Sequence, residues 1–203
     1  MTSSSTITMA VSSSSAHLYA TLAELKAYLG ISVTTDDALL SNILTRITAA
    51  IDAYCGRTFS ATATETEYFD AIEDVDGRAL YFDDDCASIT GVVNGDGVTI
   101  SSSYYVTMPT DDTPYYGIKL KASAPYAWTY TTDPENAIAV TGYWAYSLTP
   151  PADITQACVR WSAYAYRQKD AQSMTTAVEQ GFMTVGGIPD DILRLLAPYR
   201  SVI

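Results

Sequence analysis

The chain has 203 residues, of which 48% are hydrophobic and 17% are charged, and its formal net charge is −12. A chain of this length and apolar content is long enough to bury a core, which excludes a globally disordered polypeptide. Its low charged fraction implies a surface rich in Ser, Thr, Tyr and Gly, and its 16 tyrosines suit either a protein interface or an exposed sheet face.

The negative charge is concentrated in the middle of the chain. Residues 61–149 hold 14 acidic and 3 basic side chains, whereas the two flanks together hold 9 and 8. Proteins that wrap nucleic acid depend on Lys and Arg to displace counterions from the phosphates. Tight DNA binding by this region is therefore not expected, although an acidic channel wall past which DNA slides without sticking is compatible with the charge.

Residues 1–17 are rich in Ser and Thr and lack the basic residues and apolar stretch of a signal peptide. They are expected to form a flexible tail that is either disordered or ordered by a partner. No stretch reaches about 18 apolar residues, so no membrane-spanning helix is expected. Thr21-Leu-Ala-Glu24 has the form of a capping box and predicts a short helix that ends before Gly30.

A second, longer helix is predicted to begin near Thr35 or Asp36 and to end at Gly56. Either starting residue can cap the free N–H groups of the first turn. Apolar residues then recur at helical spacing, which predicts an amphipathic helix packed against another element. These residues are Leu39, Leu40, Ile43, Leu44, Ile47, Ile51 and Tyr54.

From residue 62 to residue 149 the apolar residues fall in short runs of β-forming types. Asp76-Gly77 and Asn94-Gly95-Asp96-Gly97 between these runs are hairpin signals, because these residue types accept the positive φ of a tight turn. The pattern predicts an acidic, antiparallel β-subdomain of about five to seven strands.

Two helical segments follow the predicted strands. Pro150 and Pro151 open a helix whose buried stripe is expected to include Cys158 and Trp161. A last short helix is predicted over residues 189–196, ended by Pro198. The fold class is therefore α+β, with a small helical bundle from residues 18–60 and 150–203 and an antiparallel β-subdomain inserted at residues 61–149.

Candidates for catalysis are few. A Ser-His-acid triad needs a histidine held by a folded framework, and the single histidine, His17, belongs to the predicted tail. Cys55, Cys86 and Cys158 have no histidine partner and no paired spacing, so they are expected to be reduced thiols. No glycine-rich phosphate loop precedes a helix. We expect no enzymatic activity, no cofactor and no metal.

Two acidic segments offer alternatives to this expectation. Glu73-Asp-Val-Asp76-Gly77 with Asp83 resembles part of a calcium loop, but Ile72 occupies the first ligand position, which favours a solvated hairpin. Asp83-Asp84-Asp85 could supply a carboxylate for glycoside hydrolysis, yet adjacent acids in one loop point in different directions. A hydrolase is therefore the weakest reading of the sequence.

The order of several segments resembles the head–tail connector (adaptor) proteins of tailed bacteriophages, in the form that carries a β insertion. The resemblance covers residues 18–203, and its first feature is the short capped helix. The segments are Asp37-Ala-Leu-Leu40, Ile51-Asp-Ala-Tyr54-Cys-Gly56-Arg57-Thr-Phe59, Ser88-Ile-Thr-Gly-Val92, Tyr104-Tyr-Val106, Gly117-Ile-Lys-Leu120, Ala139-Val-Thr-Gly-Tyr143, Pro151-Ala-Asp-Ile154, Tyr164-Ala-Tyr-Arg167 and Ile192-Leu-Arg-Leu-Leu-Ala-Pro-Tyr-Arg200.

The resemblance implies a structural protein of the virion neck, assembled in the host cytoplasm. Such proteins form a ring, typically of twelve identical subunits, that docks beneath the portal protein and extends the DNA channel without sequence-specific DNA binding. The ring also presents a surface to a stopper or tail-completion protein. A ring needs contacts between different faces of identical subunits. We expect Tyr54, Arg57, Tyr164, Tyr166 and Arg167 to supply these contacts.

The last segment of the chain is expected to dock on the portal through Leu193, Leu196, Tyr199 and Arg200. The sequence offers few residues to bury this segment, so we expect it to become ordered on binding. The alternative function is a β-rich virion surface or tail module that binds a glycan or a protein through Tyr and Trp side chains. The helical flanks favour the connector, because a surface module has no need of them.

Overall fold

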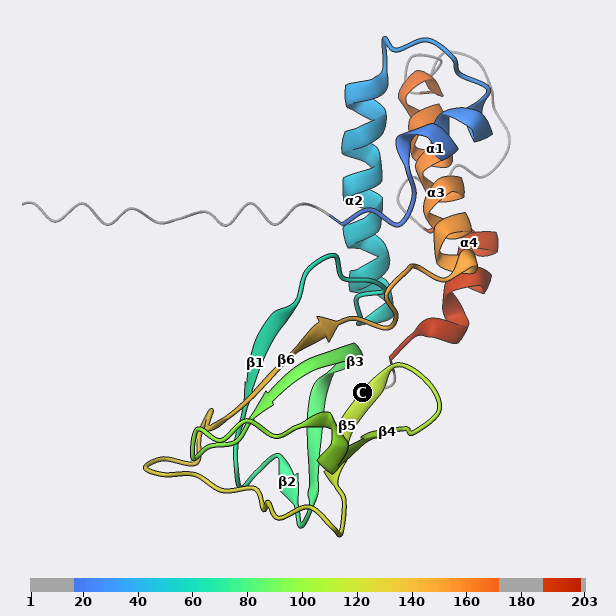
Figure 1. The fold of residues 1–203 in the computed structure, drawn as a ribbon. Helices are drawn as coiled ribbons and strands as arrows, with labels where there is room; N and C mark the ends of the chain where they lie inside the picture. The colour runs from blue at the N-terminus through green and yellow to red at the C-terminus, as the bar shows by residue number, and fades with distance from the viewer. Residues whose placement is uncertain (1–16, 172–187, 202–203) are drawn as a thin grey trace, which may run out of the picture.

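The computed structural model describes residues 17–171 and 188–201, and it arranges the helices and the strands as two adjoining layers (Figure 1). The predicted α+β class is confirmed. The predicted tail, apart from His17, and the glycine-containing stretch over residues 172–187 lie outside the described residues.

The helical layer has the elements that the sequence predicts. The Thr21 hydroxyl accepts the N–H of Glu24 at 3.2 Å, and the Glu24 carboxylate accepts the N–H of Thr21 at 2.7 Å, which completes the capping box. The first two helices end at Gly30 and Gly56, whose φ angles are +71° and +67°. The helices are α1 (Leu22–Leu29), α2 (Asp37–Cys55), α3 (Ala152–Ala171) and α4 (Asp190–Leu196), followed by a 3-10 turn (Ala197–Tyr199).

One hydrophobic core holds the helical layer together. The stripe of α2 packs against α3, α1 packs against both of these helices, and α4 packs against α3. Trp161, which was predicted to be buried, is partly buried against this core. The fully buried side chains include Leu25, Leu40, Leu44, Ile51, Ile154, Ile192 and Leu196.

The last two of these residues correct a sequence-based expectation. Ile192 and Leu196 of α4 are 1% and 0% exposed, so the final segment is packed into the helical core and does not lack burial partners. The helix predicted over residues 189–196 forms as α4, and Pro198 lies in the 3-10 turn that follows it. Short-range sequence patterns miss this burial because the covering residues come from α3.

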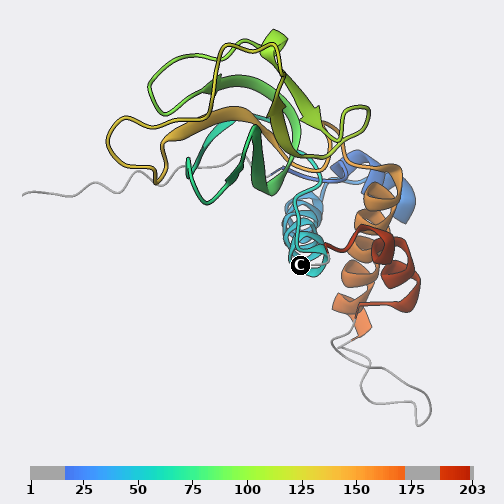
Figure 2. The same ribbon diagram turned by 90° about the horizontal axis from the view of Figure 1, so that it is seen from below.

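The sheet has six antiparallel strands, within the predicted number. Its strand order is β1-β6-β3-β5-β4, with β2 paired to β3. β3 is long and bent, because register shifts interrupt its pairing with both β5 and β6. Its first part pairs with β5 and its second part with β6, so the sheet curls (Figure 2). The strands are β1 (Glu65–Phe69), β2 (Val75–Asp76), β3 (Ala79–Val93), β4 (Tyr105–Met108), β5 (Tyr115–Leu120) and β6 (Ile138–Trp144); a 3-10 turn (Ser102–Tyr104) precedes β4.

Both predicted hairpin signals form turns. Gly77 has a φ of +60° between β2 and β3. After β3, the N–H of Asn94 donates to the carbonyl of Val98 at 2.9 Å, and the N–H of Gly97 donates to the carbonyl of Asn94 at 2.8 Å. The sequence therefore identified these two turns correctly, because the residue types that tolerate positive φ are few.

A second hydrophobic core fills the curl of the sheet. Leu80, Ile118, Ile138 and Val140 are fully buried there. The long β5–β6 connection covers this core, and the Trp128 indole donates to the carbonyl of Arg78 at 3.0 Å. The two layers thus have separate cores, and a small set of contacts at their junction must hold them together.

Gly142 of β6 shows how tightly the bent β3 passes its neighbour. A Cβ atom added to Gly142 would lie 2.5 Å from the carbonyl oxygen of Ser88, whereas one added to Gly91 of β3 would lie 3.8 Å from the nearest atom. A contact of 2.5 Å with a backbone oxygen cannot be relieved by a side-chain movement. The register shifts of β3 therefore require glycine at position 142.

We predict that Gly142→Ala lowers the free energy of unfolding by about 2 to 3 kcal/mol, because the backbone must shift to relieve the overlap. Gly91→Ala is the matched control and should change it by less than about 1 kcal/mol. Urea unfolding of both variants measures the difference. Equal effects would show that the bend does not depend on the missing side chain.

Candidate functional site

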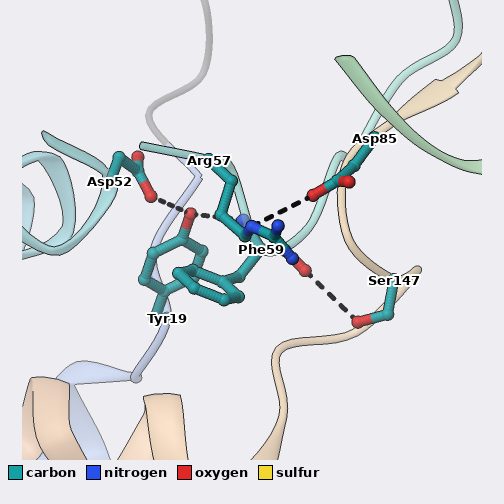
Figure 3. Close-up of polar contacts among 6 residues, drawn as sticks. All are labelled: Tyr19, Asp52, Arg57, Phe59, Asp85 and Ser147. Atoms are coloured by element: carbon teal, nitrogen blue, oxygen red, sulfur yellow. Dashed lines mark hydrogen bonds and ion pairs between the residues drawn. The ribbon is translucent and has the colours of Figure 1, made fainter. Parts of the chain in front are cut away.

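The junction between the two layers is built around the Tyr19 hydroxyl. This hydroxyl donates to the carboxylate of Asp52 on α2 and accepts the backbone N–H of Phe59 at 2.8 Å (Figure 3). Burial and the hydrogen bond to Asp52 raise the pKa of Tyr19, so the hydroxyl stays protonated and keeps donating. One side chain thereby fixes the segment before α1, the end of α2 and the chain entering the sheet.

Arg57 connects the end of α2 to strand β3. Its Nε lies 3.4 Å from Oδ2 of Asp85 (Figure 3). Its guanidinium lies 5.4 Å from the ring centroid of Tyr146. Burial raises the pKa of Asp85, and the positive charge of Arg57 opposes that rise. The segment that follows β6 is held at the same junction, because the hydroxyl of Ser147 donates to the carbonyl of Phe59 at 3.2 Å.

Aromatic rings join the C-terminal segment to the junction. The ring of Phe59 lies 5.7 Å from the ring of Tyr19, 5.8 Å from that of Tyr146 and 5.7 Å from that of Tyr199. Arg200 lies over the ring of Tyr54 at 5.2 Å. The end of the described chain is therefore held against α2 and the sheet.

Acidic side chains surround a cavity of about 230 Å³ beside this junction. Glu65 and Glu67 come from β1, and Asp83 and Asp84 come from β3. Burial, together with the charges of the neighbouring acids, raises the pKa of Glu67 to about 7. The three acids considered as candidates for glycoside hydrolysis, Asp83, Asp84 and Asp85, have different surroundings. Asp85 pairs with Arg57, while Asp83 and Asp84 are exposed.

The other residues weighed for chemistry lie apart. His17, which was assigned to the tail, is half-buried, and its Nε2 is in hydrogen-bond contact with the hydroxyl of Ser60. Cys55, Cys86 and Cys158 are buried free thiols, and burial raises their pKa, to about 12 for Cys86. Within residues 17–171 and 188–201, no three His, Cys, Asp or Glu side chains are placed to hold a metal ion.

An exposed surface with tyrosine and arginine covers the other side of the helical layer. Tyr28 of α1 and Tyr164 of α3 are 51% and 41% exposed, and they line a cavity of about 160 Å³ together with Arg167. Arg160 is also part of this surface and pairs with Asp191 of α4. Tyr and Arg are the side chains that most often dominate the energy of protein interfaces.

The residues expected at subunit contacts occupy two different settings. Tyr164 and Arg167 are exposed on α3. Tyr54 and Arg57 are partly buried at the junction, and the hydroxyl of Tyr166 donates to the carboxylate of Asp36 within the chain. The latter three side chains therefore already have partners in their own subunit.

The residues expected at the portal are similarly divided. Leu196 has no exposed surface and cannot touch a partner directly. Leu193 and Tyr199 are partly buried, and Arg200 is exposed. Sequence analysis missed Tyr19 and Tyr146 as junction residues, because their contacts join segments 33 or more residues apart and leave no local pattern.

Glu67 predicts a dependence of stability on pH. Because its folded pKa of about 7 exceeds its ordinary value of 4.5, the folded state binds more protons than the unfolded state between these values, and stability falls as pH rises from 4.5 to 7. Glu67→Gln should remove about 1 to 2 kcal/mol of this fall, a figure reduced for solvent screening. Urea unfolding at pH 5 and pH 8, with Glu135→Gln as an exposed control outside the cavity, measures it. An unchanged pH profile in Glu67→Gln would contradict the assignment.

None of the helices in the described ranges combines the length and hydropathy needed to cross a bilayer. No curated protein matches the chain. Two solved structures share its fold over 91% of both chains, each with a TM-score of 0.56. One comes from the neck of an empty gene transfer agent particle computed with C6 symmetry, at 16% identity, and the other from the virion of a native gene transfer agent particle, at 18% identity.

The family model of head completion proteins matches residues 19–202, which include both helical flanks and the whole β insertion. The predicted resemblance to head–tail connector proteins is confirmed, and with it a structural role at the neck between head and tail. This role favours the connector over the surface-module alternative. Since the match spans nearly all of the sequence, the chain belongs to the head completion protein family.

Proposed function

We propose that the chain forms a ring of twelve identical subunits beneath the portal protein, where the ring extends the DNA channel and presents a surface to a stopper or tail-completion protein. The observation that carries this proposal is the match of nearly the whole chain to head completion proteins. The shared fold with a protein in a neck computed with C6 symmetry supports a cyclic arrangement, and twelve is a multiple of six.

The two sides of the helical layer support a head-to-tail ring. Such a ring brings one face of a subunit against a different face of the next. α2 forms one side of the layer, and α1, α3 and α4 form the other (Figure 1). Tyr164 and Arg167 on the second side are exposed and can contact a neighbour, whereas Tyr54 and Arg57 lie at the junction with the sheet and Tyr166 binds Asp36 within its own subunit.

The charge of the sheet layer supports passage of DNA without binding. The β insertion has an excess of 11 negative charges, and five of its acids line one cavity. Negative side chains release no counterions from DNA and so provide no affinity for its phosphates. A wall of this composition would let the genome slide past with no preference for sequence.

The C-terminal segment supports docking on the portal, but as a segment that is already folded and not one that becomes ordered on binding. Ile192 and Leu196 anchor α4 in the helical core, which leaves Leu193 and Arg200 with surface to offer a partner. The docking segment is thus held in place before the portal binds. Preorganisation of this kind lowers the entropy lost on association.

Electron microscopy of purified necks tests the ring. The proposal expects twelve copies of this chain in a closed ring directly beneath the portal, with DNA or an open channel on the axis. A neck that lacks the chain, or a chain that caps the axis, would overturn it. Native mass measurement of the same preparation gives the subunit count independently.

We predict that Leu193→Asp abolishes attachment to the portal and leaves the subunit folded, because this side chain is only partly buried on α4. Leu196→Ala should instead lower the free energy of unfolding by about 2 to 5 kcal/mol, as expected for a cavity in a core. Val33→Asp, at a position 62% exposed between α1 and α2, is the matched control for the added charge. Co-sedimentation with portal and thermal unfolding separate these effects. Retained attachment of Leu193→Asp would contradict the docking surface.

A further inference from the structure

The sheet has a free edge along β4. Among the described strands, β4 pairs with β5 alone. The N–H of Leu120 donates to Arg78 on the β3 side, while that of Lys121 donates to Tyr104. Because backbone groups alternate in direction along an antiparallel strand, those of Tyr105, which is opposite Leu120, and of Thr107 face away from β5. These groups can pair with another extended chain.

A cavity of about 320 Å³ lies beside this edge, between β4 and the second part of β3. Ile89 of β3 and Tyr105, Val106 and Thr107 of β4 are among its lining residues. All of the lining side chains are uncharged, although the β insertion as a whole is strongly acidic. The cavity is therefore suited to an extended segment that carries small apolar side chains and no charge.

The sequence of this chain contains such a segment before its first helix. Residues 6–11 read Thr-Ile-Thr-Met-Ala-Val, in which Ile7, Met9 and Val11 alternate with smaller residues. Alternation of this kind, with β-branched residues, is typical of a strand with one apolar face. Residues 1–16 contain no charged side chain, which matches the uncharged cavity.

The point from which this segment departs also matters. His17 contacts Ser60, close to the start of β1 and the end of β6, and β1 lies at the opposite end of the sheet order from β4. In a head-to-tail ring, opposite sides of adjacent subunits meet. Met9 lies eight positions before His17, so an extended chain can carry it about 25 Å away from His17.

We propose that residues 6–11 of each subunit add a strand to the free edge of β4 in the next subunit, with the apolar side chains of Ile7, Met9 and Val11 supplied to the neighbouring cavity. Backbone hydrogen bonds to Tyr105 and Thr107 give this contact its affinity, and the cavity gives it its register. The inference rests on the proposed ring, and it names the element that links each subunit to the next.

Cysteine cross-linking in assembled particles tests the contact. Cysteine is placed at positions 7 to 11 in turn, each combined with Thr107→Cys, and the particles are oxidised. At least one pair should give a ladder of covalent multimers on a denaturing gel, while the single variants give none, since the native cysteines are buried. A monomer band with changed mobility and no multimers would indicate a cross-link within one subunit, and it would overturn the proposal. The absence of any cross-link in particles that contain the ring would also overturn it and leave the ring itself standing.

Substitutions at the two partners give a second readout. With the second cysteine moved to Thr110, which also lines the cavity, Thr107→Pro removes an N–H that does not serve β5, so the subunit should fold while the ladder falls at least about tenfold. Ile7→Asp should reduce the ladder by a similar factor, whereas Thr8→Asp on the other face should leave it nearly unchanged. Equal effects of the two Asp substitutions would contradict pairing through one apolar face. If no ring of this chain is found in the particles, the proposed function itself fails.

Discussion

The buried hydroxyl of Tyr19 joins parts of the molecule that have no shared core. The helical layer and the sheet each bury their own hydrophobic cluster, so packing alone does not set how one layer sits on the other. Tyr19 supplies that constraint by binding the Asp52 carboxylate and the Phe59 backbone at once, and the ion pair of Arg57 with Asp85 adds a second tie. A buried polar group left without its partner is costly, which makes this relative placement specific.

This constraint also governs the surfaces that a neck protein must present. Phe59, Tyr146 and Tyr199 pack against one another, so the C-terminal segment, the entry to the sheet and the exit from it share one aromatic cluster. A force on the C-terminal segment is therefore transmitted to both layers. A ring that carries load between head and tail benefits from subunits in which the layers cannot slide independently.

Charge is distributed in a way that suits the same role. Most of the acids lie in the β insertion, where burial and the charges of neighbouring acids raise the pKa of Glu67. The helical layer is nearly neutral and exposes tyrosine and arginine. Contacts between subunits through the helical layer would bring few like charges together. The acidic layer would remain wet and repel the phosphates of passing DNA.

The sequence by itself determined the α+β class, the first two helices and both glycine turns, because capping boxes, helical periodicity and positive φ are properties of adjacent residues. The order of its segments also identified the protein family. It misjudged the C-terminal segment, whose Ile192 and Leu196 are buried by α3, and it did not indicate Tyr19 or Tyr146 as junction residues. Only the tertiary structure decided these points, because each depends on contacts between residues far apart in the chain, where side-chain geometry and not local pattern determines which groups meet.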